Sequence, residues 1–345
     1  MHAGDRRGEA RRGLQKKART DVVEQSRQRL RREGVRFAMS DVCKQMGLTR
    51  QGHHKAVQAK PARVIAAEMV VQLVAEHRRE QPRIGGLKLH DMTKADLVSM
   101  GIKLGRDRFF DVLREENLLV EPKRSRTRTT NSFHRFRIWP NLVKGLEVRR
   151  ADEVWVSDIT YIRCRGGFAY LFLVTDVWSR KIVGWSLGPT LETRWSLEAL
   201  TMAVKGAHAP GEGQRRIHHS DRGVQYCSAE YVKALRSEGI EISMAEAGNP
   251  YENAIAERVN GILKDEFLLD RTMENMETAR LAVRQAVRAY NTLRPHRSIA
   301  MKKPEEKYRE APQAPGPDCG TENEVATTEH DIAATASQAV HKEAA

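Results

Sequence analysis

Between residues 154 and 188 the chain predicts three consecutive β-strands, and this meander constrains the fold more than any other feature of the sequence. Apolar and polar residues alternate along it, and short turns at 165–167 and 179–180 separate the runs. Helical and strand-like segments then alternate, which predicts an α/β fold with a mixed sheet flanked by helices on both faces. The predicted strands are 154–164, 168–178, 181–188, 215–221 and 240–244, and the predicted helices are 192–207, 228–239, 251–268 and 277–290.

The region before the sheet is helical, and its first part has a helix-turn-helix outline. Residues 39–46 carry apolar side chains at helical spacing, Gly47 follows them, and Thr49 is a candidate N-cap for a second helix. The rest of the region predicts a helix at 64–77, a turn at 84–90 and another helix that opens at 104–107.

Shifts in composition divide the chain further. Residues 121–150 are basic and lack clean periodicity, so they are predicted to be a linker that lies along a phosphate backbone. After Tyr308 large apolar residues almost vanish, and such a segment cannot bury enough surface to order itself. The predicted organisation is a basic N-terminal arm at 1–35, a helical DNA-binding region at 36–120, the linker at 121–150, an α/β domain at 151–310 and a disordered tail at 311–345.

The charge balance favours an anionic partner. Lys and Arg number 59 against 45 Asp and Glu, a formal net charge of +14, and nucleic acid is a stronger candidate partner than an anionic membrane surface. No apolar run reaches the roughly 18 residues of a spanning helix, and the start lacks the apolar core of a secretory signal, so we expect a cytoplasmic protein. The four cysteines are Cys43, Cys164, Cys227 and Cys319. Because they occur singly, reduced thiols are favoured over a zinc finger or a disulfide framework.

Three acidic residues on three predicted elements are candidate metal ligands. Asp158 lies inside an apolar strand, where an unpartnered carboxylate is costly to desolvate. Asp221 stands at a strand end, and Glu257 lies on a helix after 35 intervening residues, 222–256. Carboxylates are ligands that Mg²⁺ prefers, and phosphodiester attack is served by two such ions. We therefore expect the three acids to bind two Mg²⁺ or Mn²⁺ ions, with Asp158 bridging them, although a lone strand Asp is more often a hydrogen-bonded structural residue.

Several basic and polar residues are candidate DNA contacts. Lys264 lies two turns after Glu257 on the same helix face. Arg294 and His296 lie in a turn after the last core helix, where capping and packing explain the neighbouring Pro295 and Asn291. The candidate contacts on the second helix of the helix-turn-helix are Arg50, Gln51, His53 and Lys55. A polar helix face exposed to solvent is the alternative explanation for these residues.

Other polar residues near the acids have structural interpretations. Asp176, on the second strand, is predicted to make a structural hydrogen bond rather than to bind metal. For His218 and His219 we expect one to support the acids as a hydrogen-bond donor and the other to pack in the core.

Blocks of the sequence resemble a known family. VWVSDITYI, LVTDVWSRKIVGW, HHSDRGVQY, GNPYENAIAERVNGILKDE and YNTLRPHRSIAMKKP are similar, in unbroken order, to the OrfB transposases of the insertion-sequence-three family, within the retroviral integrase superfamily. The resemblance covers about residues 37 to 308. It implies an RNase H-like integrase catalytic core at 151–310, preceded by the helix-turn-helix portion, and makes Asp158, Asp221 and Glu257 the catalytic acids of a DDE transposase. Gly52 departs from the family pattern and predicts a weakened recognition helix.

The resemblance also implies partners and a location. The expected substrates are the two ends of an insertion sequence and its target DNA, bound by a homo-multimer on the bacterial nucleoid. An upstream-frame OrfA protein, separate or fused by frameshifting, is a further expected partner.

The expected reaction is strand cleavage by a metal-activated water, followed by attack of the freed 3′-hydroxyl on another phosphodiester. Two alternatives stay open. A nuclease on the same fold, such as a ribonuclease H or a resolvase, would cut without joining, and a non-catalytic regulator would only bind DNA. The dedicated DNA-binding region argues against the nuclease, and the presence of all three acids argues against the regulator.

Overall fold

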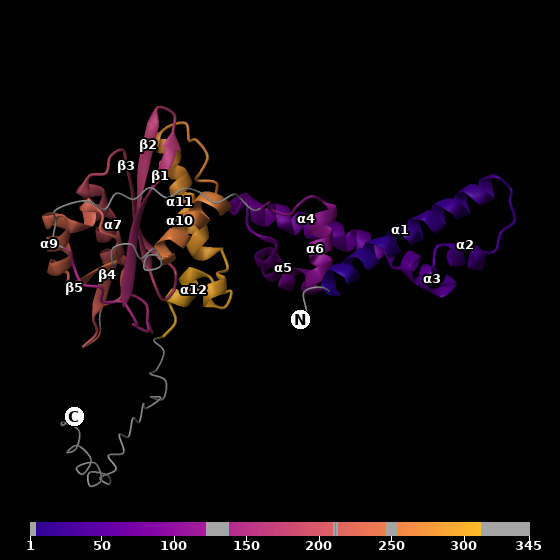
Figure 1. The fold of residues 1–345 in the computed structure, drawn as a ribbon, viewed down its shortest axis with the longest axis horizontal. Helices are drawn as coiled ribbons and strands as arrows, with labels where there is room; N and C mark the ends of the chain where they lie inside the picture. Colours follow the sequence, from indigo (N-terminus) through magenta and orange to yellow (C-terminus); the bar gives the residue numbers. More distant parts are fainter. Residues whose placement is uncertain (1–4, 122–137, 210, 212, 246–253, 312–345) are drawn as a thin grey trace, which may run out of the picture.

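The computed structural model describes residues 5–121, 138–245 except 210 and 212, and 254–311. An α/β core and an elongated helical region lie side by side (Figure 1). None of the helices in these described ranges is long and apolar enough to cross a membrane.

The core is built on a five-stranded mixed sheet in the order β3-β2-β1-β4-β5. The first three strands form the predicted antiparallel meander, and β4 and β5 extend it in parallel to β1. The strands are β1 (Val154–Cys164), β2 (Gly167–Asp176), β3 (Ile182–Gly188), β4 (Arg216–Ser220) and β5 (Ile240–Met244). The predicted mixed α/β fold is therefore confirmed. The second strand ends at Asp176 rather than at 178, because the chain turns there through Arg180, whose φ of 67° is left-handed.

Helices cover both faces of the sheet (Figure 1). On one face α10 (Ala254–Glu266) and α11 (Met276–Thr292) pack on strand residues such as Ile162 and Leu171. On the other face α7 (Thr193–Gly206) and α9 (Ala229–Ser237) pack on residues such as Phe172. The two sets of strand residues follow the two-residue alternation of a strand between two apolar layers. Three short elements complete the core: α8 (Val224–Cys227), the 3₁₀ helix η1 (Arg297–Ile299) and α12 (Pro304–Tyr308).

A glycine sets the spacing of one helix on the sheet. A Cβ atom on Gly184 of β3 would lie 2.1 Å from the carbonyl oxygen of Ala199 on α7. Since real Cβ atoms do not approach an oxygen so closely, only glycine allows α7 to sit at this depth.

The helical region contains six helices among the described residues. They are α1 (Asp5–Arg32), α2 (Met39–Gln45), α3 (Arg50–Gln58), α4 (Lys60–Glu80), α5 (Gly86–Ser99) and α6 (Arg106–Glu115). The predicted N-cap is confirmed, since the Thr49 hydroxyl oxygen accepts a 3.0 Å hydrogen bond from the Gly52 backbone N–H. A Cβ on Gly52 would lie 2.9 Å from that oxygen, so this glycine, predicted to weaken α3, also leaves room for its cap.

Two predictions in this region are wrong. The turn expected at 84–90 is the start of α5, because Gly86 packs against α6, where a Cβ would meet Phe110 and Leu113 at 3.0 Å. Residues 1–35, expected to be a basic arm or a solvated helix rather than a packed element, contain helix α1, whose Val23 is fully buried against Cys43 and Leu48. The second half of α1 is therefore packed, although the segment as a whole is basic.

The remaining predicted segments are described only in part. Most of the linker at 121–150 and nearly all of the tail at 311–345 lie outside the described residues. The described end of the linker runs beside β5, where the Leu142 backbone N–H donates to the Ser243 hydroxyl at 2.9 Å and the Arg236 guanidinium lies 5.0 Å from the Trp139 ring centre.

Candidate active site

Asp158 lies in the middle of β1, just beyond the point where β4 stops pairing with it. The last paired residues are Ser157 and Ser220, so β1 continues past β4 and Asp158 faces the gap beside it. Its carboxylate accepts a 2.7 Å hydrogen bond from the Asn260 side-chain amide and a 2.9 Å bond from the Ile159 backbone N–H. Asp158 is thus fixed between the sheet and α10.

Asp221 follows the last residue of β4, so it emerges at the level of Asp158. Its side chain accepts a 3.0 Å hydrogen bond from the Gly223 backbone N–H. A Cβ atom at Gly223 would lie 2.9 Å from the same carboxylate oxygen. Glycine at 223 therefore lets the backbone close tightly around the Asp221 side chain.

The electrostatics tie the three predicted acids together. The pKa of Asp158 is raised to about 7, first by burial and second by the neighbouring carboxylate of Asp221. Glu257 adds a weaker upward effect, while the hydrogen bonds from Asn260 and Ile159 lower it. A carboxylate so close to another, with few donors, is the kind of group whose charged form a bound cation would stabilise.

The three acids do not form a closed chelate. Glu257 is exposed in the first turn of α10. Among the described residues, no three His, Cys, Asp or Glu side chains come close enough together to hold one metal ion. The structure thus brings Asp158 and Asp221 near each other beside the end of β4, while Glu257 lies in the first turn of α10.

Two residues of this site were not predicted. Asn260 lies one helical turn after Glu257 on the same face of α10, and that i, i+3 spacing is the signal that could have identified it. Tyr226 is buried, and its pKa is raised well above the ordinary value by burial, by Tyr231, and by the charges of Asp158 and Asp221. No sequence pattern pointed to Tyr226.

These two residues carry buried polar atoms with no described partner. Within the described part of the chain, the side-chain oxygen of Asn260 and the hydroxyl of Tyr226 have no hydrogen-bond partner. Buried polar atoms are nearly always paired, so such atoms beside two carboxylates indicate room for a ligand or water.

The two histidines before Asp221 belong to the sheet interior. His218 Nε2 lies 2.7 Å from the Ser157 hydroxyl and 2.9 Å from that of Tyr231, and burial lowers its pKa to about 3, which keeps the ring neutral. His219 Nδ1 lies 2.9 Å from the Ser243 hydroxyl. These contacts fit the core-packing interpretation for both rings, and the expected donation to the acids stays a prediction.

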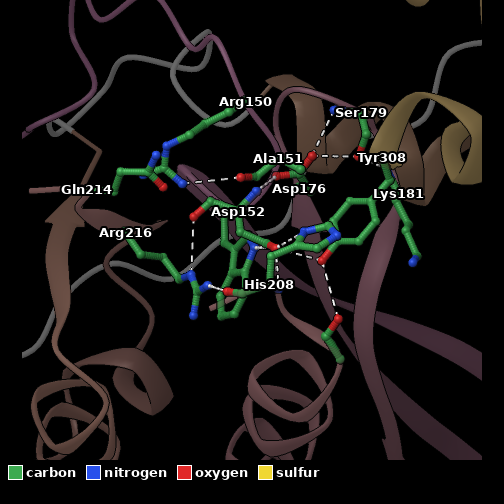
Figure 2. Close-up of polar contacts among 12 residues, drawn as sticks. Arg150, Ala151, Asp152, Asp176, Ser179, Lys181, His208, Gln214, Arg216 and Tyr308 are labelled. Atoms are coloured by element: carbon green, nitrogen blue, oxygen red, sulfur yellow. Dashed lines mark hydrogen bonds and ion pairs between the residues drawn. The ribbon is translucent and has the colours of Figure 1, made fainter. Parts of the chain in front are cut away.

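Asp176 belongs to a different cluster (Figure 2), at the end of β2 and opposite Trp155 near the start of β1. Its carboxylate accepts hydrogen bonds from the Asp152 and Ser179 backbone N–H groups, both at 2.8 Å, and from the Ser179 hydroxyl at 2.5 Å. Asp176 is completely buried. The predicted structural hydrogen bonding of Asp176 is therefore confirmed.

Asp152 is the centre of this cluster. Its carboxylate accepts bonds from the Trp155 indole at 3.0 Å, from the His208 backbone N–H at 2.9 Å and from the Tyr308 hydroxyl at 2.7 Å. The His208 ring lies within 2.9 Å of the same carboxylate and stacks on Tyr308. We call Asp152, Asp176, Ser179, His208 and Tyr308 the structural acid cluster.

The predicted DNA-contact residues have different surroundings. Lys264 is half-buried, with its ammonium 4.2 Å from the Tyr161 ring centre. Arg294 is 1% exposed and forms a bidentate pair with Glu266 at 2.8 and 2.9 Å, so a direct contact of this residue with DNA stays a prediction. His53 is buried, with Nε2 3.3 Å from a Glu24 carboxylate oxygen, whereas the other candidates on α3 are exposed: Arg50, Gln51 and Lys55.

Comparison with known proteins identifies the family. Two profiles described as integrase core domain match residues 148–250 and 238–304. The chain is 31% identical to the insertion element IS600 uncharacterized 31 kDa protein of Shigella sonnei, over 78% of this chain and 99% of the relative. It is 30% identical to the transposase for insertion sequence element IS904 of Lactococcus lactis, over 74% of this chain and 99% of the relative.

A further relative and one solved structure are also similar to the chain. Transposase InsF for insertion sequence IS3A of Escherichia coli is 28% identical over 75% of this chain and 90% of its own length. Among solved structures, the HTLV-2 integrase catalytic core domain in complex with magnesium aligns with 46% of this chain and 97% of that chain, at 19% identity and a TM-score of 0.37. From the IS600 and IS904 relatives, the chain belongs to the insertion-sequence-three type of transposases within the integrase superfamily.

Proposed function

We propose that this protein is a DNA transposase that cleaves the ends of an insertion sequence and joins them to target DNA. The observation that carries the proposal is the juxtaposition of Asp158 and Asp221 beside the end of β4, where the pKa of Asp158 is raised by burial and by its neighbour. The relatives named above, two of them transposases, support the same activity.

Asp158, Asp221 and Glu257 are the proposed catalytic residues and metal ligands. The donor set fits a hard divalent cation, because all three offer carboxylate oxygens and the first two share a crowded negative site. Two Mg²⁺ or Mn²⁺ ions, when bound, would supply an activated hydroxyl nucleophile and stabilise the leaving oxygen. Glu257 would have to turn inward from the first turn of α10 to join the other two acids.

The chain's own groups position these acids. The Asn260 amide holds Asp158 at 2.7 Å, and this hydrogen bond restricts the carboxylate to a rotamer that faces α10. The Asn260 side-chain oxygen and the Tyr226 hydroxyl remain open to a water or a substrate oxygen. Lys264 and the exposed residues of α3, Arg50, Gln51 and Lys55, are the proposed DNA contacts of the core and of the helix-turn-helix.

The test is a strand-transfer assay with oligonucleotides that carry the element's terminal sequence. We expect Asp221→Asn to abolish both cleavage and joining and to leave DNA affinity unchanged. Glu198→Gln, at an exposed acid of α7, is the matched control and should keep full activity. Cleavage without joining in the unaltered protein would indicate a nuclease, and binding without either reaction would indicate a regulator.

Metal binding has a separate readout. Titration calorimetry with Mn²⁺ should detect binding to the unaltered protein, and Asp158→Asn and Asp221→Asn should each weaken it at least tenfold. Equal Mn²⁺ affinity in all three proteins would contradict the ligand assignment.

The assembly and its location are also part of the proposal. Two DNA ends must be handled together, so we propose a homo-multimer on DNA, with an upstream-frame OrfA protein as a further partner. Sedimentation velocity with and without end-sequence duplexes tests the multimer. We propose that the complex acts on the nucleoid in the bacterial cytoplasm.

A further inference from the structure

A groove of about 830 Å³ separates the helical region from α10. The start of α5 forms one wall, the first turns of α10 form another, and residues 294–298 with Arg180 close it. The described lining of the groove contains no Asp or Glu. It contains five cationic residues: Lys88, Arg180, Arg258, Arg294 and Arg297. A second groove of about 550 Å³, within the helical region, is lined by acids as well as bases, such as Glu68 and Glu115 beside Arg63.

One acid behind the groove fixes two of these cations. Glu266 accepts from the Lys88 ammonium at 2.7 Å and from both arms of the Arg294 guanidinium. The Glu266 carbonyl also accepts the Arg83 backbone N–H at 3.0 Å, which joins the helical region to α10. Lys88 and Arg294 are therefore paired with Glu266 where the helical region meets α10. The net positive charge of the groove comes from Arg180, Arg258 and Arg297.

The positive charge is dense enough to affect a buried neighbour. The pKa of His296 is lowered to about 3, first by burial and then by Arg294, Arg180, Lys88 and Arg258. Four cationic side chains thus act on one point of the groove wall. Like charges at this density repel one another, and an anion placed among them would relieve the repulsion.

Arg180 is held in an unusual way at the groove. Its backbone has a φ of 67°, a left-handed conformation that is uncommon for a residue with a side chain. Its guanidinium Nε donates to the Ser298 hydroxyl at 3.2 Å, while Nη1 is buried and has no hydrogen-bond partner among the described residues. A buried, unpaired guanidinium nitrogen is costly, and a phosphate oxygen would satisfy it.

We propose that this groove binds the phosphate backbone of a DNA strand, with Arg180, Arg258 and Arg297 as the phosphate contacts. Arg258 and Arg297 are exposed and can reach an incoming strand. The apolar side chains in the same groove, Leu87, Phe110 and Ile255, offer contact area for sugars and bases. Guanidinium groups match phosphate geometry and are typical of such sites.

The groove deepens the proposed function, on which it rests, because it lies beside the catalytic acids. Arg258 follows Glu257 directly, so the two side chains point about 100° apart around α10. One face of the helix therefore borders the acids and the next face borders the groove. A strand in the groove would run along α10 toward Asp158 and Asp221.

The test measures DNA affinity by fluorescence anisotropy across a range of salt concentrations. The variants are Arg258→Ala, Arg297→Ala and the double substitution, with Lys205→Ala and Lys233→Ala as charge-matched controls. Both control lysines are exposed on α7 and α9, across the sheet from the groove. Each lost phosphate contact lowers the magnitude of the slope of log affinity against log salt by about 0.9. The slope of the double variant should therefore be smaller by about 1.8, and its DNA affinity should fall by roughly tenfold or more. The controls should match the unaltered protein.

A second arm places the contact on the DNA. Single neutral methylphosphonates are introduced along the terminal strand, and one of them should weaken binding by the unaltered protein but not by Arg258→Ala. Affinity and salt slope unchanged in the double variant would overturn the proposal. So would normal DNA affinity combined with weakened self-association, because the groove would then hold an acidic protein surface.

The two proposals can fail separately. Asp221→Asn should keep the full groove-dependent affinity while it loses cleavage. Groove variants that bind DNA normally, in a protein that still cleaves and joins, would refute the groove alone. A protein with groove-dependent binding but no cleavage or joining would refute the transposase activity alone.

Discussion

Two pairs of acids lie beside β1, and their surroundings differ. Asp152 and Asp176, in the structural acid cluster, accept hydrogen bonds from Trp155, Tyr308, Ser179 and backbone N–H groups (Figure 2). Asp158, in the middle of β1, and Asp221, after β4, each accept from a neighbouring backbone N–H, and Asp158 also from Asn260. The first pair accepts from many donors, whereas Asp158 lies near two buried polar atoms, the Asn260 side-chain oxygen and the Tyr226 hydroxyl, that have no partner among the described residues.

The difference separates the structural acids from the proposed catalytic ones. Donors that converge on a buried carboxylate stabilise the fold, because their removal would leave a charge or a donor unsatisfied. A carboxylate whose charged form burial disfavours, such as Asp158, would be stabilised by a bound cation. The comparison predicts opposite effects of substitution at Asp152 and at Asp158.

The largest expected effect is the loss of activity on substitution of Asp158. Asp158→Asn should reduce cleavage and joining by on the order of 10³-fold, because metal-ion stabilisation of the transition state is worth several kcal/mol. The same change should leave thermal stability equal or higher, since it removes a carboxylate whose charged form is disfavoured by burial. Activity assays and differential scanning calorimetry on one preparation test both parts, and a large loss of stability would blur the distinction between the two pairs.

The largest effect on stability is expected at Asp152, in the structural acid cluster. Asp152→Ala leaves the Trp155, His208 and Tyr308 donors without their shared acceptor and should lower the free energy of unfolding by about 3–5 kcal/mol. Urea unfolding measures the change. The protein that remains folded should keep its Mn²⁺ affinity, and a protein of normal stability without Mn²⁺ binding would reverse the roles of the two clusters.

A smaller effect isolates one hydrogen bond of the structural acid cluster. Tyr308→Phe keeps the ring stacked on His208 and removes only the hydroxyl that donates to Asp152 at 2.7 Å. We expect a loss of about 1–3 kcal/mol in the free energy of unfolding, because the acceptor is buried and charged. Tyr161→Phe, at a tyrosine that is 48% exposed, is the matched control and should change stability by less than about 0.5 kcal/mol.

The subtlest expected effect is a pH dependence of stability. Burial raises the pKa of Asp176 from 3.8 to about 6, against the lowering effect of its Ser179 and Asp152 hydrogen bonds. The folded protein therefore holds this proton more tightly than the unfolded chain, so the contribution is fully present below pH 3.8 and is lost as the pH rises through 6. Asp176→Asn should remove that slope between pH 4 and 6, measured as the difference between two urea-unfolding series. Parallel series would show that Asp176 titrates normally.

Much of the core was predictable because its signals are local. The two-residue alternation of 154–164 corresponds to β1 at the same bounds, and the antiparallel meander follows from the short turns that separate its strands. Thr49 was recognisable as an N-cap from its place before a helical run. The positions of Asp158, Asp221 and Glu257 on two strand segments and a helix were equally readable from the spacing.

Local signals failed where packing overrides composition. Residues 84–90 contain two glycines and were predicted to turn, yet Gly86 serves the close approach of α5 and α6. The basic segment at the N-terminus gave no sign that Val23 would be completely buried. Both errors have one cause: helix formation there depends on partners that are distant in the sequence.

The sequence by itself determined the order of elements, the mixed sheet and the identity of the candidate acids. Only the tertiary structure decided what surrounds each acid. The Asn260 amide meets Asp158 across 102 positions, and the Tyr308 hydroxyl meets Asp152 across 156. Periodicity reports which face of an element is apolar, whereas the donors that reach a buried carboxylate are chosen when remote elements close on one another. For that reason Asp152, just before β1, is a structural residue, while Asp158, within β1, is a candidate catalytic residue.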